Sequence, residues 1–159
     1  MGTEKPIFLG LPDNRLDSID FLKIVQKIEE RVLKIQPEIV YTHHGGDLNL
    51  DHQIVHRAVI TAFRPMPGSC LQKIFFFETL SSTEWSSLSI GPIFNPTHFV
   101  NVTRTLDVKL AALACYKSEM RDYPHPRSID GVKSLAQVRG SHVGVDAAEA
   151  FEVILDIKY

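Results

Sequence analysis

A chain of 159 residues, 44% of them hydrophobic, has the size and composition of one globular domain, and we expect a single domain over residues 1–159. Its 17 basic and 19 acidic residues give a formal net charge of -2 without a basic tail or stripe, which argues against a DNA or RNA partner. The apolar stretches are too short to span a bilayer and the first six residues are polar, so we expect a soluble, cytoplasmic protein with no membrane span.

Strand and helix patterns alternate in the first part of the chain. Residues 6–11 (PIFLGL) form a short apolar run before a turn-like Pro-Asp-Asn sequence, which is typical of a buried strand. Over residues 18–35 apolar side chains recur at steps of three and four, which predicts an amphipathic helix. Residues 38–42 (EIVYT) predict a second strand and residues 53–63 a second helix. This alternation favours a parallel, doubly wound α/β sheet.

The middle of the chain adds two strands and a helix. Residues 74–78 (IFFFE) predict another buried strand, and residues 98–102 predict an edge strand. Thr105 or Asp107 can cap a helix that runs to about Arg121.

The last third predicts a helix and a tail of mixed character. The helix covers residues 128–139 and ends at Gly140, the residue type favoured just past a helix C-terminus. The tail AAEAFEVILDI changes from a helix-like to a strand-like pattern near Phe151. Cys70 and Cys115 are isolated in the sequence, and we interpret both as inert thiols in the core.

The most unusual segment is YTHHGGDLNLDHQIVH, residues 41–56, which contains four histidines. It lies at the carboxyl end of the predicted strand 38–42 and leads into the next predicted helix. Ligands of open α/β sheets bind at this end, because loops converge there and helix N-termini present N–H groups to the crevice. The position of the segment therefore favours a functional role.

Three interpretations of the alternating Asp47, Asn49 and Asp51 compete. A calcium loop of the EF-hand kind needs glycine at its sixth place and glutamate at its twelfth, where this chain has His52 and Ala58. A structural interpretation has the Asp and Asn side chains cap the helix and shape the turn. In the third interpretation His52 binds a metal ion, and Asp51 or Asp47 orients it or polarises a bound water.

Thr42 to His52 fit the pattern T-H-H-x-x-D-x-N-x-D-H, which resembles the second metal motif of the LmbE-like / PIG-L superfamily of metal-dependent N-deacetylases. Members of this superfamily remove acetyl from N-acetylglucosaminyl compounds. Other stretches agree in the same order along the chain: residues 11–13, Lys109, residues 124–128 (PHPRS), Arg139 with Gly140, and residues 148–151 (AEAF).

The resemblance implies a Rossmann-like, mostly parallel sheet with flanking helices and one catalytic metal, usually zinc, held by three protein ligands. His52 matches the ligand that closes the second motif. The other two ligands and the general base come from an early H-P-D-D motif in the family, and this chain has none. Its only His-Pro pair, His125 and Pro126, is followed by Arg127. We therefore expect an N-terminally truncated domain with an incomplete metal site.

The resemblance also suggests catalytic roles for three side chains near His52. Asn49 stands where many relatives have a histidine that acts as an acid or an oxyanion donor, and its amide can donate a hydrogen bond but cannot shuttle a proton. His44 is a candidate for that proton-transfer role. Asp51 is expected to orient the metal ligand, and His43 to pack behind the loop.

Two residues outside the segment are candidates for substrate binding. Asp13, at the carboxyl end of another predicted strand, is placed to bind sugar hydroxyls, although a turn-shaping role fits it nearly as well. Arg127 resembles a family position, with a loop-tying role as the alternative. Trp85 could stack on a sugar ring or serve as a packing anchor. For His56 we prefer a position at the crevice rim to a metal-binding pair with His52.

The sequence thus predicts a zinc-dependent deacetylase of an acetamido-sugar conjugate, with another divalent metal as an alternative to zinc. The competing hypothesis is a non-catalytic module that binds a sugar or a protein. Loss of interior strands exposes a sheet edge and apolar helix faces, so we also predict a homo-oligomer.

Overall fold

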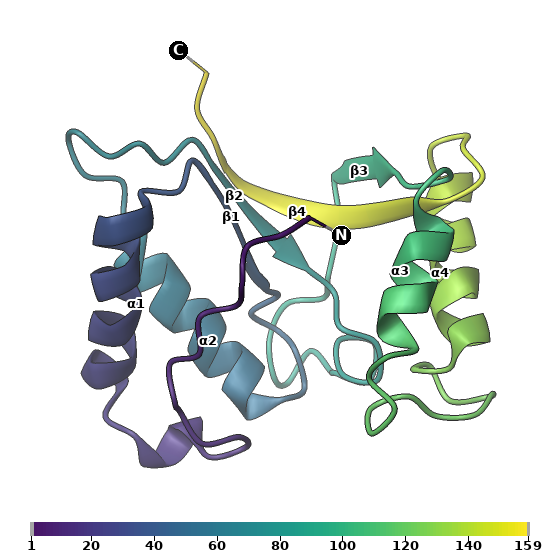
Figure 1. The fold of residues 1–159 in the computed structure, drawn as a ribbon, viewed down its shortest axis with the longest axis horizontal. Coiled ribbons are helices and arrows are strands. Elements are labelled where there is room, and N and C mark those ends of the chain that lie inside the picture. The colour runs from purple at the N-terminus through teal and green to yellow at the C-terminus, as the bar shows by residue number, and fades with distance from the viewer. Residues whose placement is uncertain (1, 159) are drawn as a thin grey trace. The chain divides into compact units, whose positions relative to one another are not determined.

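The computed structural model describes residues 2–158 and has the predicted α/β fold class (Figure 1). The elements in chain order are η1 Leu16–Ser18, α1 Phe21–Ile35, β1 Ile39–His43, α2 Leu50–Ala62, β2 Lys73–Phe77, β3 His98–Asn101, α3 Leu106–Leu113, α4 Ile129–Ser141 and β4 Ala148–Asp156. The strands are hydrogen-bonded in the order β1-β2-β4-β3. The chain divides into two compact units, residues 2–94 with 152–158, and residues 95–151.

In the larger unit, α2 connects two parallel strands, β1 and β2, whose pairing runs from Ile39 opposite Lys73 to His43 opposite Phe77. Apolar side chains of both strands, of α2 and of the segment just before β2 form one core cluster: Val40, Val59, Leu71, Ile74 and Phe76. Each such side chain contributes roughly 1.5–3 kcal/mol when it is removed from water. This core packs α2 against β1 and β2, and the histidine-rich segment lies where β1 leads into α2.

A second core cluster joins α1 and η1 to α2, and the two helices lie side by side in Figure 1. Its buried members are Leu16, Ile24, Val25 and Ala58. Helix α1 begins after Asp20, whose carboxylate accepts the Leu22 N–H at 3.0 Å, as a capping side chain does. The predicted helix over residues 18–35 is therefore confirmed, with a start three residues later.

The last residues of β4 also belong to the larger unit. The Ile157 N–H donates to the Gln72 carbonyl at 2.9 Å, and Lys73 lies 3.6 Å from the carboxylate of Asp156. The end of β4 therefore lies beside the start of β2, which means that the two strands run in opposite directions. The sheet combines this pairing with the parallel β1–β2 pair.

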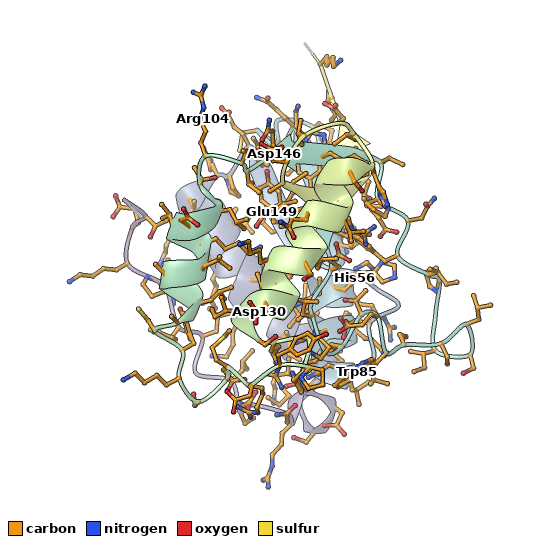
Figure 2. The ribbon with its side chains drawn as sticks, turned by 90° about the vertical axis from the view of Figure 1, so that its right-hand side faces the viewer. His56, Trp85, Arg104, Asp130, Asp146 and Glu149 are labelled. Atoms are coloured by element: carbon orange, nitrogen blue, oxygen red, sulfur yellow. The ribbon has the colours of Figure 1, made fainter. Side chains whose placement is uncertain are left out.

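In the smaller unit, β3 and the first residues of β4 pair antiparallel, from His98 opposite Phe151 to Asn101 opposite Ala148. Lys109 of α3 forms an ion pair with Glu149 of β4. Figure 2 labels Glu149. The buried side chains of this unit's core cluster are Leu106, Ala136 and Ala147.

Helix α4 confirms the predicted helix, but Gly140 has a different role from the one predicted. Ser128 caps the helix by accepting the Gly131 N–H at 2.9 Å. Gly140 lies inside the helix instead of just past its end. A Cβ atom at Gly140 would lie 2.5 Å from the Val145 carbonyl oxygen, so glycine is required for close approach of the following loop.

The predicted strand at residues 6–11 is wrong. The segment is irregular and exposed, with Phe8 85% accessible and Ile7 54%. Apolar composition favours a strand only where a neighbour supplies hydrogen-bond partners, and none of the strands described in residues 2–158 pairs with this segment.

Three smaller expectations also differ from the structure. Helix α3 ends at Leu113 instead of about Arg121, because the N–H groups of Cys115 and Tyr116 bond carbonyls three residues back and tighten the chain into turns. The tail is a strand from Ala148 onward, without a helical part. Cys70 and Cys115 are exposed and not core thiols. Among residues 2–158, no helix is both long and apolar enough to cross a membrane.

Candidate functional site

The loop between β1 and α2, residues 44–49, is tightly packed at two glycines. A Cβ atom at Gly45 would lie 2.7 Å from the His56 ring, and one at Gly46 would lie 2.1 Å from the Pro92 carbonyl oxygen. The backbone contact excludes a side chain at Gly46, and a side chain at Gly45 would require the His56 ring to move. The two glycines therefore let the loop turn closely around the end of β1.

The loop ends at Asn49, which caps α2. Its side-chain oxygen accepts the N–H groups of Asp51 at 2.8 Å and His52 at 3.4 Å. The structural interpretation, in which Asn49 caps the helix, therefore accounts for its side-chain oxygen. Its amide group donates to Asn14 at 3.5 Å. The cap places His52 in the first turn of the helix, beside the loop.

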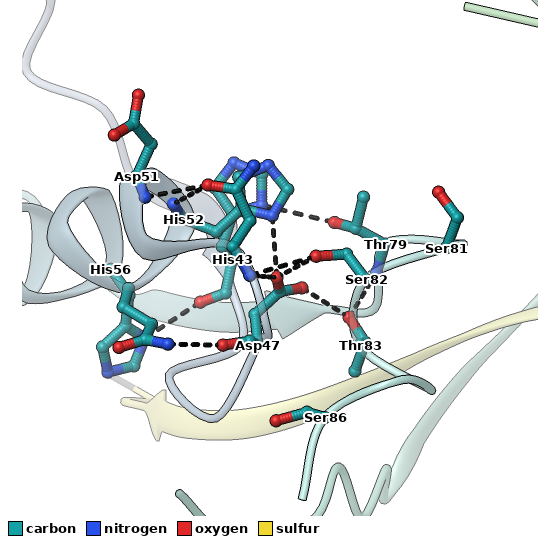
Figure 3. A network of polar contacts seen from close by, with 12 residues as sticks. His43, Asp47, Asp51, His52, His56, Thr79, Ser81, Ser82, Thr83 and Ser86 are labelled. Atoms are coloured by element: carbon teal, nitrogen blue, oxygen red, sulfur yellow. Dashed lines mark hydrogen bonds and ion pairs between the residues drawn. The ribbon is translucent and has the colours of Figure 1, made fainter. Parts of the chain in front are cut away.

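Asp47 is the centre of the network in Figure 3 and is 0% exposed. Its Oδ1 accepts hydrogen bonds from the Asn49 N–H at 2.9 Å, from His52 Nδ1 at 3.0 Å and from the Ser82 hydroxyl. Its Oδ2 accepts the Thr83 hydroxyl at 2.7 Å. Burial alone would raise the pKa of Asp47, but the hydrogen bonds from His52, Ser82 and Asn49 lower it to about 2. Asp47 is therefore a buried carboxylate that stays ionised.

His43 lies directly on His52. Their ring centroids are 3.9 Å apart and their planes differ by 6°. His43 Nδ1 is 3.3 Å from the Thr79 hydroxyl. Burial, together with the charge of His52, lowers the pKa of His43 to about 4. His43 was predicted to pack behind the loop, and the structure brings it into contact with the candidate ligand.

His44 is 2% exposed and uses both ring nitrogens. Nδ1 lies 2.7 Å from a carboxylate oxygen of Glu152, and Nε2 lies 2.9 Å from the Pro92 carbonyl. The Pro92 carbonyl and an ionised Glu152 carboxylate only accept, so both contacts favour a ring that donates from both nitrogens, which is the imidazolium form. Burial opposes this charge, but the hydrogen bonds to Glu152 and Pro92 raise the pKa of His44. His44 thus ties the end of β1 to β4 and to the loop before β3.

Asp51 and His56 contact the body of the larger unit. Asp51 accepts the Leu16 N–H at 3.0 Å and so anchors η1 to α2. His56 Nδ1 donates to the His43 carbonyl at 2.9 Å, and its ring meets Phe76 edge-on at 4.4 Å. Burial lowers the pKa of His56. His56 therefore faces the strands and not the crevice rim that the sequence suggested.

The two predicted substrate-binding residues lie in different units. Asp13 is exposed in a turn and accepts the Asn14 amide at 3.1 Å, and Asn14 in turn contacts Asn49. The turn of Asp13 is thus brought next to the start of α2. Arg127 belongs to the smaller unit, where it pairs with Glu119 at 2.7 Å. Trp85 is exposed on the loop after β2.

The described residues do not fit a complete catalytic metal site. Within residues 2–158, no three His, Cys, Asp or Glu side chains are grouped so that they could hold a metal ion. The parallel rings of His43 and His52 cannot aim their in-plane lone pairs at one ion, and Asp47 already accepts four hydrogen bonds. A zinc site needs about three protein ligands, so His52 alone would hold an ion weakly.

The sequence reasoning missed the hydroxyl groups that bind Asp47. Ser82 and Thr83 follow β2, the strand that pairs parallel with β1. Carboxyl ends of parallel neighbours meet at one edge of a sheet, so the run TLSST after strand 74–78 was the available signal. Glu152 had no such signal, because it is 108 residues from His44.

Comparisons with known proteins agree with this architecture. Residues 1–63 match the family model PIG-L, described as GlcNAc-PI de-N-acetylase. The chain is similar in structure to the conserved protein TT1542 from Thermus thermophilus, with 22% identity and a TM-score of 0.70, over 94% of this chain and 66% of that one. No curated protein matches.

Two further solved structures share the fold. An N,N'-diacetylchitobiose deacetylase from Pyrococcus horikoshii matches with 17% identity and a TM-score of 0.74, over 97% of this chain and 58% of that chain. GalB, the 4-carboxy-2-hydroxymuconate hydratase from Pseudomonas putida KT2440, matches with 18% identity and a TM-score of 0.64, over 89% of this chain and 61% of that one. The chain therefore spans less than two thirds of the length of each of these three structures.

Fold and site together define an α/β protein with a histidine-centred polar site at the carboxyl end of two parallel strands. The family match includes all of residues 41–56, and the structural likeness extends over nearly the whole chain. Residues 1–63 are thus similar to the PIG-L family, and the chain as a whole shares its fold with the three solved structures.

Proposed function

We propose that this chain is a hydrolase-type domain for removal of acetyl from an N-acetylglucosaminyl-type sugar conjugate, with His52 as its metal-binding imidazole. The observation that carries the proposal is the contact between His52 and the buried carboxylate of Asp47. A carboxylate behind a metal-binding histidine orients the ring and strengthens its ligating nitrogen. The metal in the proposal is zinc or another divalent ion, which would activate water and polarise the acetamide carbonyl.

Residues around His52 have separate roles in the proposal. Asp47 holds the ring of His52, whereas Asp51 and His44 maintain the loop and helix through their contacts with Leu16 and Glu152. Both nitrogens of His44 are hydrogen-bonded, so the proposal assigns this residue to holding the loop and not to proton transfer.

Contacts with the substrate are assigned to three further residues. Asn49 keeps an amide that can donate to a developing oxyanion, because its bond to Asn14 is long, at 3.5 Å. Asp13 remains the proposed partner of sugar hydroxyls, and Arg127 remains a candidate from the smaller unit.

We expect this chain by itself to bind zinc weakly and to lack deacetylase activity, because its described residues provide no three-donor metal site. A cytoplasmic location and a homo-oligomeric state complete the proposal, on the sequence grounds given above.

Zinc titration and an acetate-release assay test the proposal. We expect weak zinc binding that is lost in His52→Gln and kept in His142→Gln, which changes an exposed histidine of the smaller unit. Acetate release from N-acetylglucosamine or diacetylchitobiose is expected to stay at background. Rapid acetate release by this chain would contradict the expectation that its metal site is incomplete. Unchanged zinc binding by His52→Gln would contradict the proposed role of His52.

The second candidate function is a non-catalytic module that binds a sugar or a protein. The lack of a three-donor group in the described part of the chain favours it. Sugar binding that is equal with and without zinc, and equal in His52→Gln, would support this function over the hydrolase.

A further inference from the structure

The loop after β2 directs two hydroxyl groups at Asp47 (Figure 3). The Thr79 N–H donates to Thr83 Oγ1 at 2.7 Å, and a hydroxyl has one hydrogen, so that hydrogen is left to donate to Asp47 Oδ2. Ser82 accepts the Asn49 N–H at 3.3 Å in the same way, while its hydroxyl donates to Asp47 Oδ1. Both hydroxyl groups therefore have a defined direction.

The backbone of this loop is held by its own hydrogen bonds. The Thr83 N–H donates to the Thr79 carbonyl at 2.8 Å, and the Ser82 N–H donates to the Glu84 carboxylate at 3.3 Å. The Leu48 N–H donates to the Ser82 carbonyl at 3.4 Å, which joins the loop to the segment that carries Asp47. The two hydroxyl groups are thus presented by a preorganised loop.

Anchoring both oxygens prevents rotation of the Asp47 carboxylate. Thr83 holds Oδ2, so Oδ1 is turned toward His52 Nδ1 at 3.0 Å. An ionised carboxylate only accepts hydrogen bonds, so Nδ1 must carry the hydrogen. In a neutral ring, Nε2 then has the free lone pair.

We propose that Ser82 and Thr83 are positioning residues that act through Asp47 and hold the neutral ring of His52 in the Nδ1–H tautomer. Nε2 is thereby kept as a proton acceptor or metal-binding nitrogen. This tautomer is the less favoured form of free histidine, so a specific partner is needed to select it. The proposal does not depend on deacetylation, because it concerns the state of the ring in this chain as it is.

Nitrogen NMR of 15N-histidine-labelled protein tests the proposal, because the two ring nitrogens of a neutral imidazole have different shifts in each tautomer. Spectra are recorded well above the ordinary histidine pKa of about 6.5, and the His52 signals are identified by their absence in His52→Gln. We expect the Nδ1–H pattern in the wild type. In the double variant Ser82→Ala/Thr83→Val, we expect this exclusive pattern to be lost and the Nε2–H form to be populated.

Two matched variants separate positioning from general loop damage. Ser86→Ala removes a hydroxyl that donates to the Gly46 carbonyl, and Thr83→Ser keeps the hydroxyl. Both are expected to retain the wild-type pattern. An Nε2–H pattern in the wild type, or an unchanged pattern in the folded double variant, would overturn the proposal. If the double variant does not fold, the single variants Ser82→Ala and Thr83→Val are measured instead. A wild-type tautomer pattern of His52 in both single variants would also overturn the proposal.

Discussion

Asp47 and His44 are both buried, and the charged form of each is stabilised by partners from distant parts of the chain. A buried charge without partners is strongly unfavourable, so both residues depend on hydrogen bonds that only the folded chain provides. Their pKa shifts have opposite signs, and each predicts a different dependence of stability on pH.

Asp47 stabilises the fold at neutral pH and loses this effect in acid. Its pKa of about 2 lies below the ordinary value of 3.8, so the stabilisation is present above pH 3.8 and is lost as the pH falls to about 2. We expect Asp47→Asn to lower the free energy of unfolding by roughly 2 kcal/mol at pH 5, with little difference at pH 2.

Urea unfolding of both proteins between about pH 2 and pH 5 measures this difference, with Asp13→Asn in the exposed turn as a control that stays parallel to the wild type. The pKa of His43, about 4, adds a separate loss below pH 6.5, because unfolded histidine binds a proton more readily. If the free energies of unfolding of the wild type and Asp47→Asn differed by the same amount at every pH, the prediction for Asp47 would be contradicted.

The ion pair of His44 with Glu152 predicts the opposite dependence. A raised histidine pKa stabilises the fold fully below about 6.5, and the effect is lost as the pH rises through the folded value. We expect Glu152→Gln to destabilise the protein more at pH 6 than at pH 9. Thermal unfolding at the two pH values checks this, with Glu149→Gln, an acidic residue of the smaller unit, as the control. An equal loss at both pH values would show that His44 is not charged in the fold.

At the scale of elements, the first turn of α2 determines where His52 lies. Asn49 accepts two N–H groups that have no partner within the helix, and its neighbours Asp47 and Asp51 contact other segments. The alternation of polar residues in this stretch therefore serves the helix start and the loop together. This is why the capping and metal-site interpretations describe the same residues.

Removal of the cap is expected to weaken α2. Asn49→Ala lowers the free energy of unfolding by about 1 kcal/mol, whereas Asn49→Asp keeps a side-chain oxygen that can accept the same N–H groups. Chemical unfolding followed by circular dichroism measures both variants. An equal loss of unfolding free energy in the two variants would mean that the hydrogen bond from the Asn49 side-chain amide to Asn14 matters more than the cap.

Elements with strong local signals were predicted correctly. Helix α1 has a capping aspartate and a regular apolar face, and strands β1 and β2 coincide with apolar runs in the sequence. The segment 6–11 has a similar apolar run but no neighbouring strand, and its predicted strand was wrong. Local pattern therefore predicts which segments can form an element, while a partner decides whether a strand forms.

At the scale of the molecule, β1 lies at one end of the strand order. Ile39 and Tyr41 on this strand are 47% and 50% exposed. An edge strand with apolar side chains is a site for pairing with another chain. This feature supports the predicted homo-oligomer.

We expect the protein to self-associate as its concentration rises, and Tyr41→Lys to reduce this, because a charged side chain on an edge strand opposes pairing. Size-exclusion chromatography with light scattering over a range of concentrations measures both proteins. Tyr116→Lys, at an exposed tyrosine of the smaller unit, is the control. A stable monomer at every concentration would count against self-association.

The sequence by itself determined the α/β class, most helix and strand positions in the larger unit, and the place of the candidate site between β1 and α2. These features depend on residue periodicity, capping side chains and one contiguous motif, all of which are local. The tertiary structure decided the partners: Ser82 and Thr83 on Asp47, Glu152 on His44, and His43 stacked on His52. It also decided that no three metal donors converge among residues 2–158. Hydrogen bonds and ring contacts depend on distances of a few ångströms between residues far apart in the chain, and only folding sets those distances.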